Sequence, residues 1–147
     1  MNEVIQTLRY GGLRVRTALW VLPPEQLPRL PDSAARLGIH LVDIRQPLLN
    51  TVAPGQRFLR LGLREFIGAL DKLCNDNHAS DCLLVANSDL IIAKLTNSER
   101  KDLWETLFRG FPYRPRALLI VMPANAISLL PTVEQLDKWR KDGRLVP

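Results

Sequence analysis

Two short runs in which every residue is apolar constrain the fold of this chain more than any other feature: Cys82–Ala86 and Ala117–Met122. A strand with one face in water alternates polar and apolar residues, whereas a strand covered on both faces is apolar throughout. The segment Val15–Leu22 ends in a similar run and stops at Pro23, which has no N–H to donate to a sheet. A fourth strand is predicted at Ile39–Ile44. These patterns predict a sheet sandwiched between two layers of helices.

Helical patterns fill the intervals between these strands. Large apolar residues recur at spacings of three and four up to Cys74, which predicts a helix over residues 58–75. Two capping boxes, Thr96-x-x-Glu99 and Thr132-x-x-Gln135, predict helices that run to about residues 108 and 141.

Shorter elements complete the pattern. Asp32 can cap a helix over residues 33–37, and Gly38 stands where a helix C-terminal glycine belongs. The proline-rich segment 23–31 is predicted to be a loop, residues 89–95 a short helix and residues 144–146 a last short strand. Strands and helices thus alternate. This predicts a single α/β domain over residues 1–147, with three α/β/α layers around a mostly parallel sheet of four to five strands.

Composition excludes several classes of protein. Apolar residues make up 46% and charged residues 24%, as in ordinary globular domains, and no run of apolar residues is long enough to span a membrane. The first residues lack the basic start and apolar stretch of a secretory signal, so a cytoplasmic protein is expected. The chain has two cysteines: Cys74 falls on the apolar face of a predicted helix, and Cys82 begins a predicted buried strand. We expect two buried free thiols and neither metal nor cofactor.

Positive charge is concentrated in the first part of the chain. Residues 1–64 hold nine arginines, no lysine and four acidic residues, whereas residues 65–147 hold eleven basic and eleven acidic residues. Arginine suits bidentate contacts with carboxylate or phosphate. Either a solvated helix face or a surface for a nucleic-acid backbone or an acidic protein would produce this pattern. The candidate surface residues are Arg14, Arg16, Arg57, Arg60, Arg64, Arg114 and Arg116.

The connections that follow the predicted strands are where a parallel sheet binds its ligands. A phosphate-binding loop needs glycines that let successive N–H groups face the anion, and a lysine for the outer phosphates. The connection from Pro23 to Leu30 has neither glycine nor lysine. After the run that ends at Ala86, the chain has Asn87 and Ser88 in the place of a magnesium-binding acid. We therefore expect no catalytic residues and no enzymatic activity from this chain alone.

Two polar residues at these connections leave alternatives open. Asp89 is either a cap of the following helix or an acid of the site, and Asn125 is either a turn residue or a polar sensor of a phosphate. No other arrangement in the chain matches a known catalytic motif.

The order of these elements, with the apolar strand leading into Asn87-x-Asp89-Leu90, resembles the P-loop NTPase superfamily of the additional-strand type. More narrowly, it is similar to the small P-loop-like subunits that accompany large ATPases in bacteriophage-exclusion defence systems. Because the phosphate-loop residues are missing, the resemblance implies a P-loop NTPase-like core that is degenerate and retained for binding.

Arg144 lies near the last predicted helix of this core. In oligomeric NTPases an arginine in such a place can reach the γ-phosphate of a neighbouring subunit, as an arginine finger. The resemblance therefore makes Arg144 a candidate finger and admits a homo-oligomer. The alternative is a simple exposed charge.

Three functions follow as hypotheses. The first is a non-catalytic accessory or adaptor subunit that docks on a larger partner, such as an ATPase or nuclease of an anti-phage or other DNA-processing system. The second is a DNA- or RNA-binding module that uses the arginine-rich surface. The third is a nucleotide sensor built on Asn87, Asp89 and Asn125.

Overall fold

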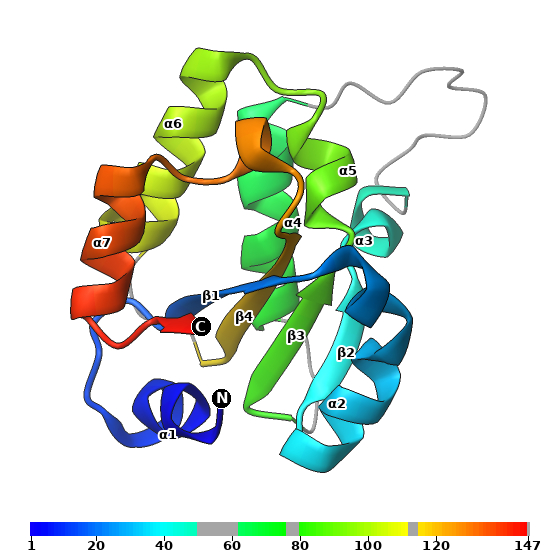
Figure 1. The fold of residues 1–147 in the computed structure, drawn as a ribbon, viewed down its shortest axis with the longest axis vertical. Helices are drawn as coiled ribbons and strands as arrows, with labels where there is room; N and C mark the ends of the chain where they lie inside the picture. The colour runs from blue at the N-terminus through cyan, green and yellow to red at the C-terminus, as the bar shows by residue number, and fades with distance from the viewer. Residues whose placement is uncertain (50–61, 76–79, 112–114, 147) are drawn as a thin grey trace.

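A computed structural model describes residues 1–49, 62–75, 80–111 and 115–146 of the chain. In this part of the chain five strands form one sheet, all parallel, in the order β2-β3-β4-β1-β5 (Figure 1). The strands are β1 (Thr17–Leu22), β2 (His40–Asp43), β3 (Cys82–Ala86), β4 (Ala117–Pro123) and β5 (Leu145–Val146). The predicted α/β class and parallel sheet are confirmed.

The described residues also form seven α-helices and three short helices of other types. The α-helices are α1 (Asn2–Tyr10), α2 (Leu30–Leu37), α3 (Arg45–Leu49), α4 (Leu63–Asn75), α5 (Ser88–Ile92), α6 (Asn97–Glu105) and α7 (Val133–Lys141). The others are the 3-10 helices η1 (Pro24–Arg29) and η3 (Ile127–Leu129) and the π-helix η2 (Thr106–Gly110).

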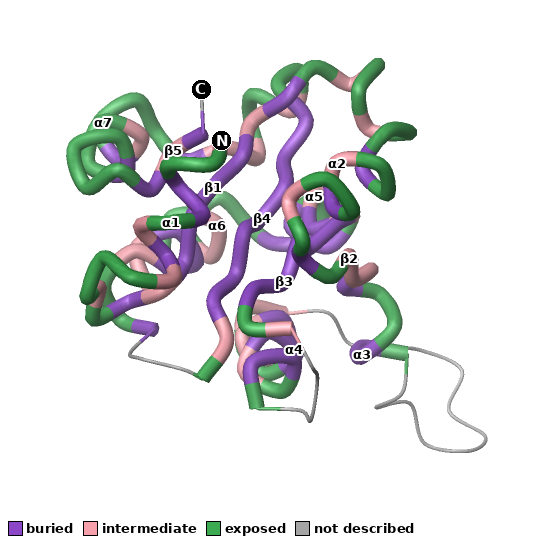
Figure 2. Tube along the Cα trace, turned by 90° about the horizontal axis from the view of Figure 1, so that it is seen from below, coloured by how far each residue is buried: buried purple, intermediate pink, exposed green. Residues whose placement is uncertain are grey.

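Two helical layers cover the sheet. Helices α1 and α2 pack on one face, against the side chains of Ala18, Trp20 and Leu22 in β1. The other five α-helices pack on the opposite face, where the side chain of Leu19 in β1 also points. Strands β3 and β4 are buried at every position, as their apolar runs predict (Figure 2). The structure is therefore a three-layer α/β/α sandwich.

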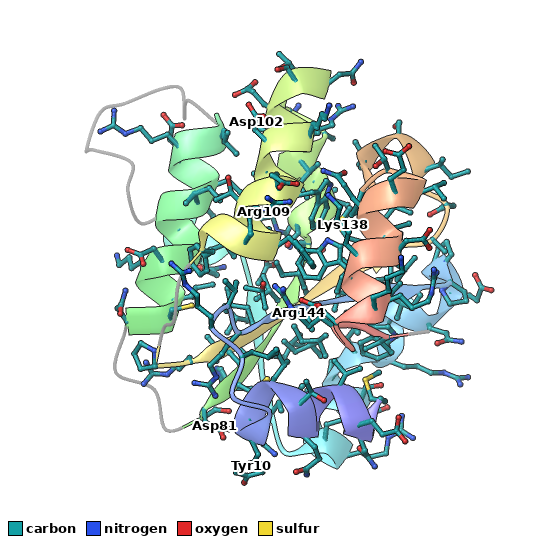
Figure 3. The ribbon with its side chains drawn as sticks, turned by 90° about the vertical axis from the view of Figure 1, so that its left-hand side faces the viewer. Tyr10, Asp81, Asp102, Arg109, Lys138 and Arg144 are labelled. Atoms are coloured by element: carbon teal, nitrogen blue, oxygen red, sulfur yellow. The ribbon has the colours of Figure 1, made fainter. Side chains whose placement is uncertain are left out.

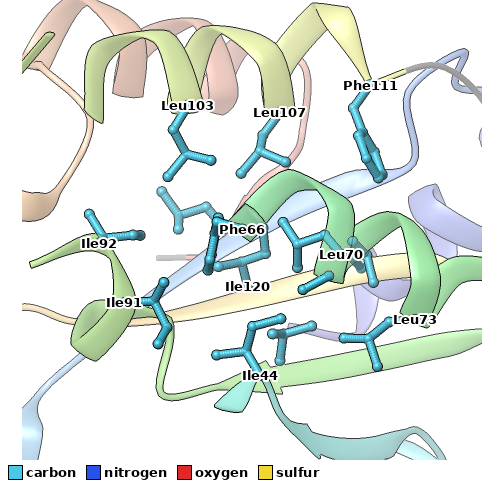
Figure 4. Close-up of a cluster of buried hydrophobic side chains, with 14 of the residues drawn as sticks. Ile44, Phe66, Leu70, Leu73, Ile91, Ile92, Leu103, Leu107, Phe111 and Ile120 are labelled. Carbon is cyan, nitrogen blue, oxygen red and sulfur yellow. The ribbon is translucent and has the colours of Figure 1, made fainter. Parts of the chain in front are cut away.

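The larger of the two cores lies under α4 and α6. Phe66 and Leu70 of α4 meet Leu103 of α6 and Ile120 of β4 in a close-packed cluster (Figure 4). Cys74 lies in the same core, and Cys82 lies in the core under α1 and α2. Both thiols are free and buried, and burial raises the pKa of Cys82 to about 12. The two cysteines therefore act as small apolar residues, as predicted.

Both predicted capping boxes are present. Thr96 Oγ1 accepts a hydrogen bond from the N–H of Glu99 (3.2 Å), and Glu99 Oε1 accepts one from the N–H of Thr96 (3.0 Å). Thr132 and Gln135 make the same reciprocal pair at the start of α7. Glu99 Oε2 also accepts from the N–H of Leu63 (3.2 Å), so a single carboxylate fixes the starts of α6 and α4.

The predicted loop over residues 23–31 is wrong, because η1 and the start of α2 occupy it. A proline's fixed φ suits the first turn of a helix, where its missing N–H has no partner to lose. Pro24 and Pro31 lie in the first turns of η1 and α2. Helix α2 consequently begins at Leu30, and Asp32 lies in its first turn instead of capping it. Gly38 ends the helix with φ 65°, as expected.

Other boundaries also differ from those predicted. Strand β1 begins at Thr17, two residues later than expected, and the described part of α4 begins at Leu63, with residues 58–61 outside the described ranges. Helices α1 and α3 were not predicted. No helix in the described ranges combines the length and apolar character that crossing a bilayer requires.

Replacing Thr96 with alanine removes one half of the α6 capping box. We expect Thr96→Ala to lower the free energy of unfolding by about 1 kcal/mol, measured by urea denaturation. Ser98→Ala, an exposed change within the same helix, is the matched control and should leave stability unchanged or slightly higher. Equal stabilities for the two variants would contradict a role for the capping box.

Candidate functional site

The carboxyl edge of the sheet contains a point where neighbouring connections diverge. The chain leaves β1 toward α2 on one face, while it leaves the adjacent β4 toward α7 on the other. Such a switch point is where open parallel sheets bind ligands. Here the N–H of Ala124 donates to the carbonyl of Leu22 (2.8 Å), so backbone pairing continues one residue past the end of β4.

The connection after β1 becomes helical at once. Pro23 has φ −58° and ψ 140°, and η1 begins at the next residue. Pro23, Pro24 and Pro28 have no N–H, and the N–H of Gln26 donates to the carbonyl of Pro23 (3.0 Å). A phosphate cradle requires consecutive N–H groups that face the ligand. In this connection, the N–H groups that remain belong to the short helix η1 instead.

The residue that follows β3 adopts a left-handed backbone conformation. Asn87 has φ 66°, and it is the only non-glycine residue with positive φ in the described ranges. An L-residue in this left-handed conformation costs about 1–2 kcal/mol, although asparagine tolerates it better than most. Helix α5 begins directly afterwards at Ser88, so Asp89 lies in its first turn and does not cap it. The first alternative for Asp89, a helix cap, is therefore wrong.

An ion pair occupies the end of β2. Arg45 donates from Nε and Nη2 to both oxygens of Asp43 at 2.6–3.1 Å, and the N–H of Arg45 donates to Asp43 Oδ1 (3.0 Å). The hydrogen bonds from Arg45 lower the pKa of Asp43, and a further hydrogen bond from Asn87 acts in the same direction. This pair was not predicted, although the spacing Asp-x-Arg after a strand was an available signal in the sequence.

A hollow of about 290 Å³ lies at this edge, between η1, α2 and the end of β3. Asn87 and Asp89 contribute its amide and its carboxylate, and the remaining lining is apolar: Leu27, Pro28, Leu30, Pro31, Leu41, Ala86 and Val121. Asn125 is exposed and does not line it. Of the three residues considered for nucleotide sensing, the structure therefore brings two together. An apolar hollow with one carboxylate suits an apolar or cationic side chain better than a phosphate.

Four of the arginines predicted to form one surface lie in the described ranges, and these four are dispersed. Arg57, Arg60 and Arg114 lie outside the described residues. Arg14 is exposed before β1, at the amino edge of the sheet, while Arg64 is exposed in the first turn of α4. A helix that connects parallel strands runs antiparallel to them, so Arg64 lies toward the carboxyl edge. The two exposed arginines are thus at opposite ends of the domain.

Arg16 and Arg116 bind segments within the fold. Arg16 donates to the carbonyls of Leu8 (2.9 Å) and Pro115 (3.3 Å), and Arg116 donates to those of Cys74 (3.0 Å) and Ser80 (3.1 Å). Both side chains are partly buried. Carbonyls from distant parts of the chain thus accept hydrogen bonds from both guanidinium groups, and a role for these arginines on a partner surface stays a prediction.

Arg144 is buried, with only 3% of its surface exposed (Figure 3). Its guanidinium donates to the carbonyl (2.6 Å) and Oγ1 (2.7 Å) of Thr17 and to the carbonyls of Leu107 (3.2 Å) and Phe108 (2.9 Å) in the π-helix. It also stacks on the rings of Phe108 and Trp139, 4.7 and 4.6 Å from their centroids.

This burial lowers the pKa of Arg144 and corrects both interpretations of the residue. A buried guanidinium with this many internal acceptors cannot extend into a neighbouring subunit as an arginine finger. It is not an exposed charge either. The buried side chain of Arg144 contacts the start of β1, the π-helix and α7, and so connects these three elements within the core.

The chain was compared with protein-family models, with curated proteins and with solved structures. None of the three comparisons found a match.

Removing the Arg144 side chain takes a donor away from the carbonyls of Thr17 and Phe108, while the Leu107 carbonyl keeps the Thr17 hydroxyl as its donor. We expect Arg144→Ala to lower the free energy of unfolding by about 2–5 kcal/mol. Arg140→Ala, in the same region but exposed and forming an exposed ion pair with Asp137, should cost about 0.5 kcal/mol or less. Chemical denaturation of the two variants measures the difference. Similar stabilities would show that the internal contacts of Arg144 contribute little.

The left-handed backbone of Asn87 gives a second prediction. Asn87→Ala should lower stability by about 1 kcal/mol, because alanine cannot compensate for the unfavourable φ. Asn87→Gly should be closer to the parent, since glycine adopts this φ without steric cost. Thermal and urea unfolding of both variants measure this order, and an alanine variant more stable than the glycine variant would contradict it.

Proposed function

We propose that this chain is a non-catalytic accessory subunit, built on a P-loop NTPase-like core, that docks on a larger protein partner. Such a partner would be an ATPase or nuclease of a DNA-processing or anti-phage defence system. The observation that carries the proposal is the connection after β1. At the place where a phosphate loop would present its N–H groups, the chain has Pro23 and Pro24 and closes into the 3-10 helix η1.

The topology supports the same proposal. Strand β4 pairs with both β1 and β3 and so stands between them as an additional strand. This is consistent with the additional-strand type that the sequence resembles. The likeness rests on the order and direction of the strands, so it concerns the core and not the chemistry.

The polar groups at the carboxyl edge also favour binding over hydrolysis. Asp43, the carboxylate at the end of β2, forms an ion pair with Arg45, which compensates its negative charge. Asn87 stands directly after β3, where hydrolytic sites place an acid that holds magnesium. The hollow beside it is mainly apolar. A surface of this composition suits contacts with another protein.

Protein binding has more support than nucleic-acid binding. Arg16 and Arg116 use their guanidinium groups within the fold, and Arg14 and Arg64 lie at opposite ends of it. A nucleic-acid backbone needs a continuous run of cations along its path. The four described arginines of the candidate surface do not provide one.

Two measurements test the proposal. With about 5 mM ATP and Mg²⁺, a site of about 50 µM affinity would add about 2.7 kcal/mol of stability by mass action, so we expect no thermal shift here. An active P-loop ATPase is the positive control. Tagged full-length chain from the native host should co-purify with one larger protein in fixed stoichiometry after nuclease treatment. A nucleotide-induced shift, or the absence of any stoichiometric partner, would overturn the proposal.

A further inference from the structure

A groove of about 460 Å³ lies between α3 and α4, on the face of the sheet opposite α1 and α2. The two helices are in contact, and Figure 1 shows α3 toward the right-hand edge of the domain and α4 behind the strands. Helix α3 contributes Pro47 and Leu48 to the groove. Helix α4 contributes a stripe of residues on one side of the helix: Arg64, Glu65, Gly68, Ala69 and Lys72.

Two unpaired cations stand at the ends of this groove. Arg64 and Lys72 are exposed, and neither forms a hydrogen bond or ion pair with any residue that the structure describes. They are eight residues apart on one helix, which places their Cα atoms about 12 Å apart. The neighbouring carboxylate, Glu65, accepts from the N–H of Gly62 (3.1 Å) and so caps its own helix. The hydrogen bond leaves Glu65 charged, so the two cations and one carboxylate give the lining a net positive charge.

The floor between the two cations is apolar and open. Gly68 stands midway between Arg64 and Lys72, and a Cβ built there would meet no atom within 4 Å. Glycine within a helix costs about 1 kcal/mol relative to alanine, and internal packing does not require it at this position. Its smallness instead keeps the groove open for a group that approaches from outside. Leu48 and Ala69, both buried, form the apolar surroundings.

We propose that this groove binds an acidic amphipathic helix of the partner protein. Two carboxylates about two helical turns apart would pair with Arg64 and Lys72, and a small apolar side chain between them would rest on Gly68. The inference depends on the proposed function, because it specifies the chemistry of the partner that the accessory subunit meets.

The same features disfavour nucleic acid in this groove. A nucleic-acid strand carries a phosphate at every nucleotide, so some of its charges would lie over the apolar floor. Only the two ends of the groove offer cations. An acidic helix can place charges at those ends and apolar groups between them.

Charge reversal and groove filling test the site in the complex. Full-length tagged chains carrying Arg64→Glu with Lys72→Glu, or Gly68→Trp alone, should retain about tenfold less partner than the parent chain. Lys101→Glu with Lys138→Glu, two exposed lysines on α6 and α7, is the charge-matched control and should retain the partner fully. Circular dichroism and thermal unfolding verify that each variant folds. The space around Gly68 makes the tryptophan variant the fallback if the double reversal fails to fold.

A zero-length carbodiimide crosslink identifies what faces Lys72. The reagent activates a carboxylate, and attack by the lysine amine forms an amide bond while the reagent leaves as a urea. Mass spectrometry should find Lys72 joined to an Asp or Glu in an acidic amphipathic segment of the partner. Lys72→Arg keeps the charge but lacks the reactive amine, so it should retain the partner and lose this crosslink.

The outcomes separate the two proposals. If the partner co-purifies undiminished with the reversed and filled variants, the groove is not its docking site, although the accessory role stands. If nuclease treatment removes everything bound to the groove, or if Lys72 couples to a second copy of this chain, the acidic partner helix is also refuted. If no form of the chain retains a partner, the proposed function fails and the groove inference fails with it.

Discussion

The burial of β1, β3 and β4 on both faces is the constraint on which the rest of this structure depends. Every residue of β3 and β4 is buried, and β1 contributes apolar side chains to both cores. No residue in the middle of these strands can therefore meet a ligand. Chemistry and recognition are restricted to the connections at the ends of the strands and to the outer helices. The prolines after β1, the Asp43–Arg45 pair after β2 and the α3–α4 groove are all found in these places.

The sequence predicts those elements whose signals are local. A run such as Ala117–Met122 is apolar at every position because both its faces are covered, and a capping box such as Thr96-x-x-Glu99 acts within one turn of chain. The prolines after β1 led to the wrong prediction of a loop, because the fixed φ of proline suits both a turn and the first turn of a helix. The 3-10 helix there leads directly into α2 at Leu30.

The arginines could not be assigned from sequence for a different reason. A long side chain with five N–H donors finds its acceptors wherever the fold brings backbone carbonyls together. Arg144 binds Thr17, and Arg116 binds Cys74 and Ser80, across large separations in the chain. Spacing along a helix or strand carries no information on such contacts. Spacing was informative only for Arg64, whose place on an exposed side of α4 follows from the period of the helix.

The position of β1 has a consequence for how the chain acquires its structure. Strand β1 lies between β4 and β5, and each of its partners in the sheet is about a hundred residues or more further along the chain. During synthesis, β1 leaves the ribosome long before either neighbour exists. Until the last quarter of the chain has been synthesised, the backbone of β1 therefore stays unpaired. During this time its apolar faces are covered at most in part, by α1 and α2. Pairings between strands so far apart in the sequence make folding slow. The first strand to be synthesised is therefore one of the last to pair in the sheet.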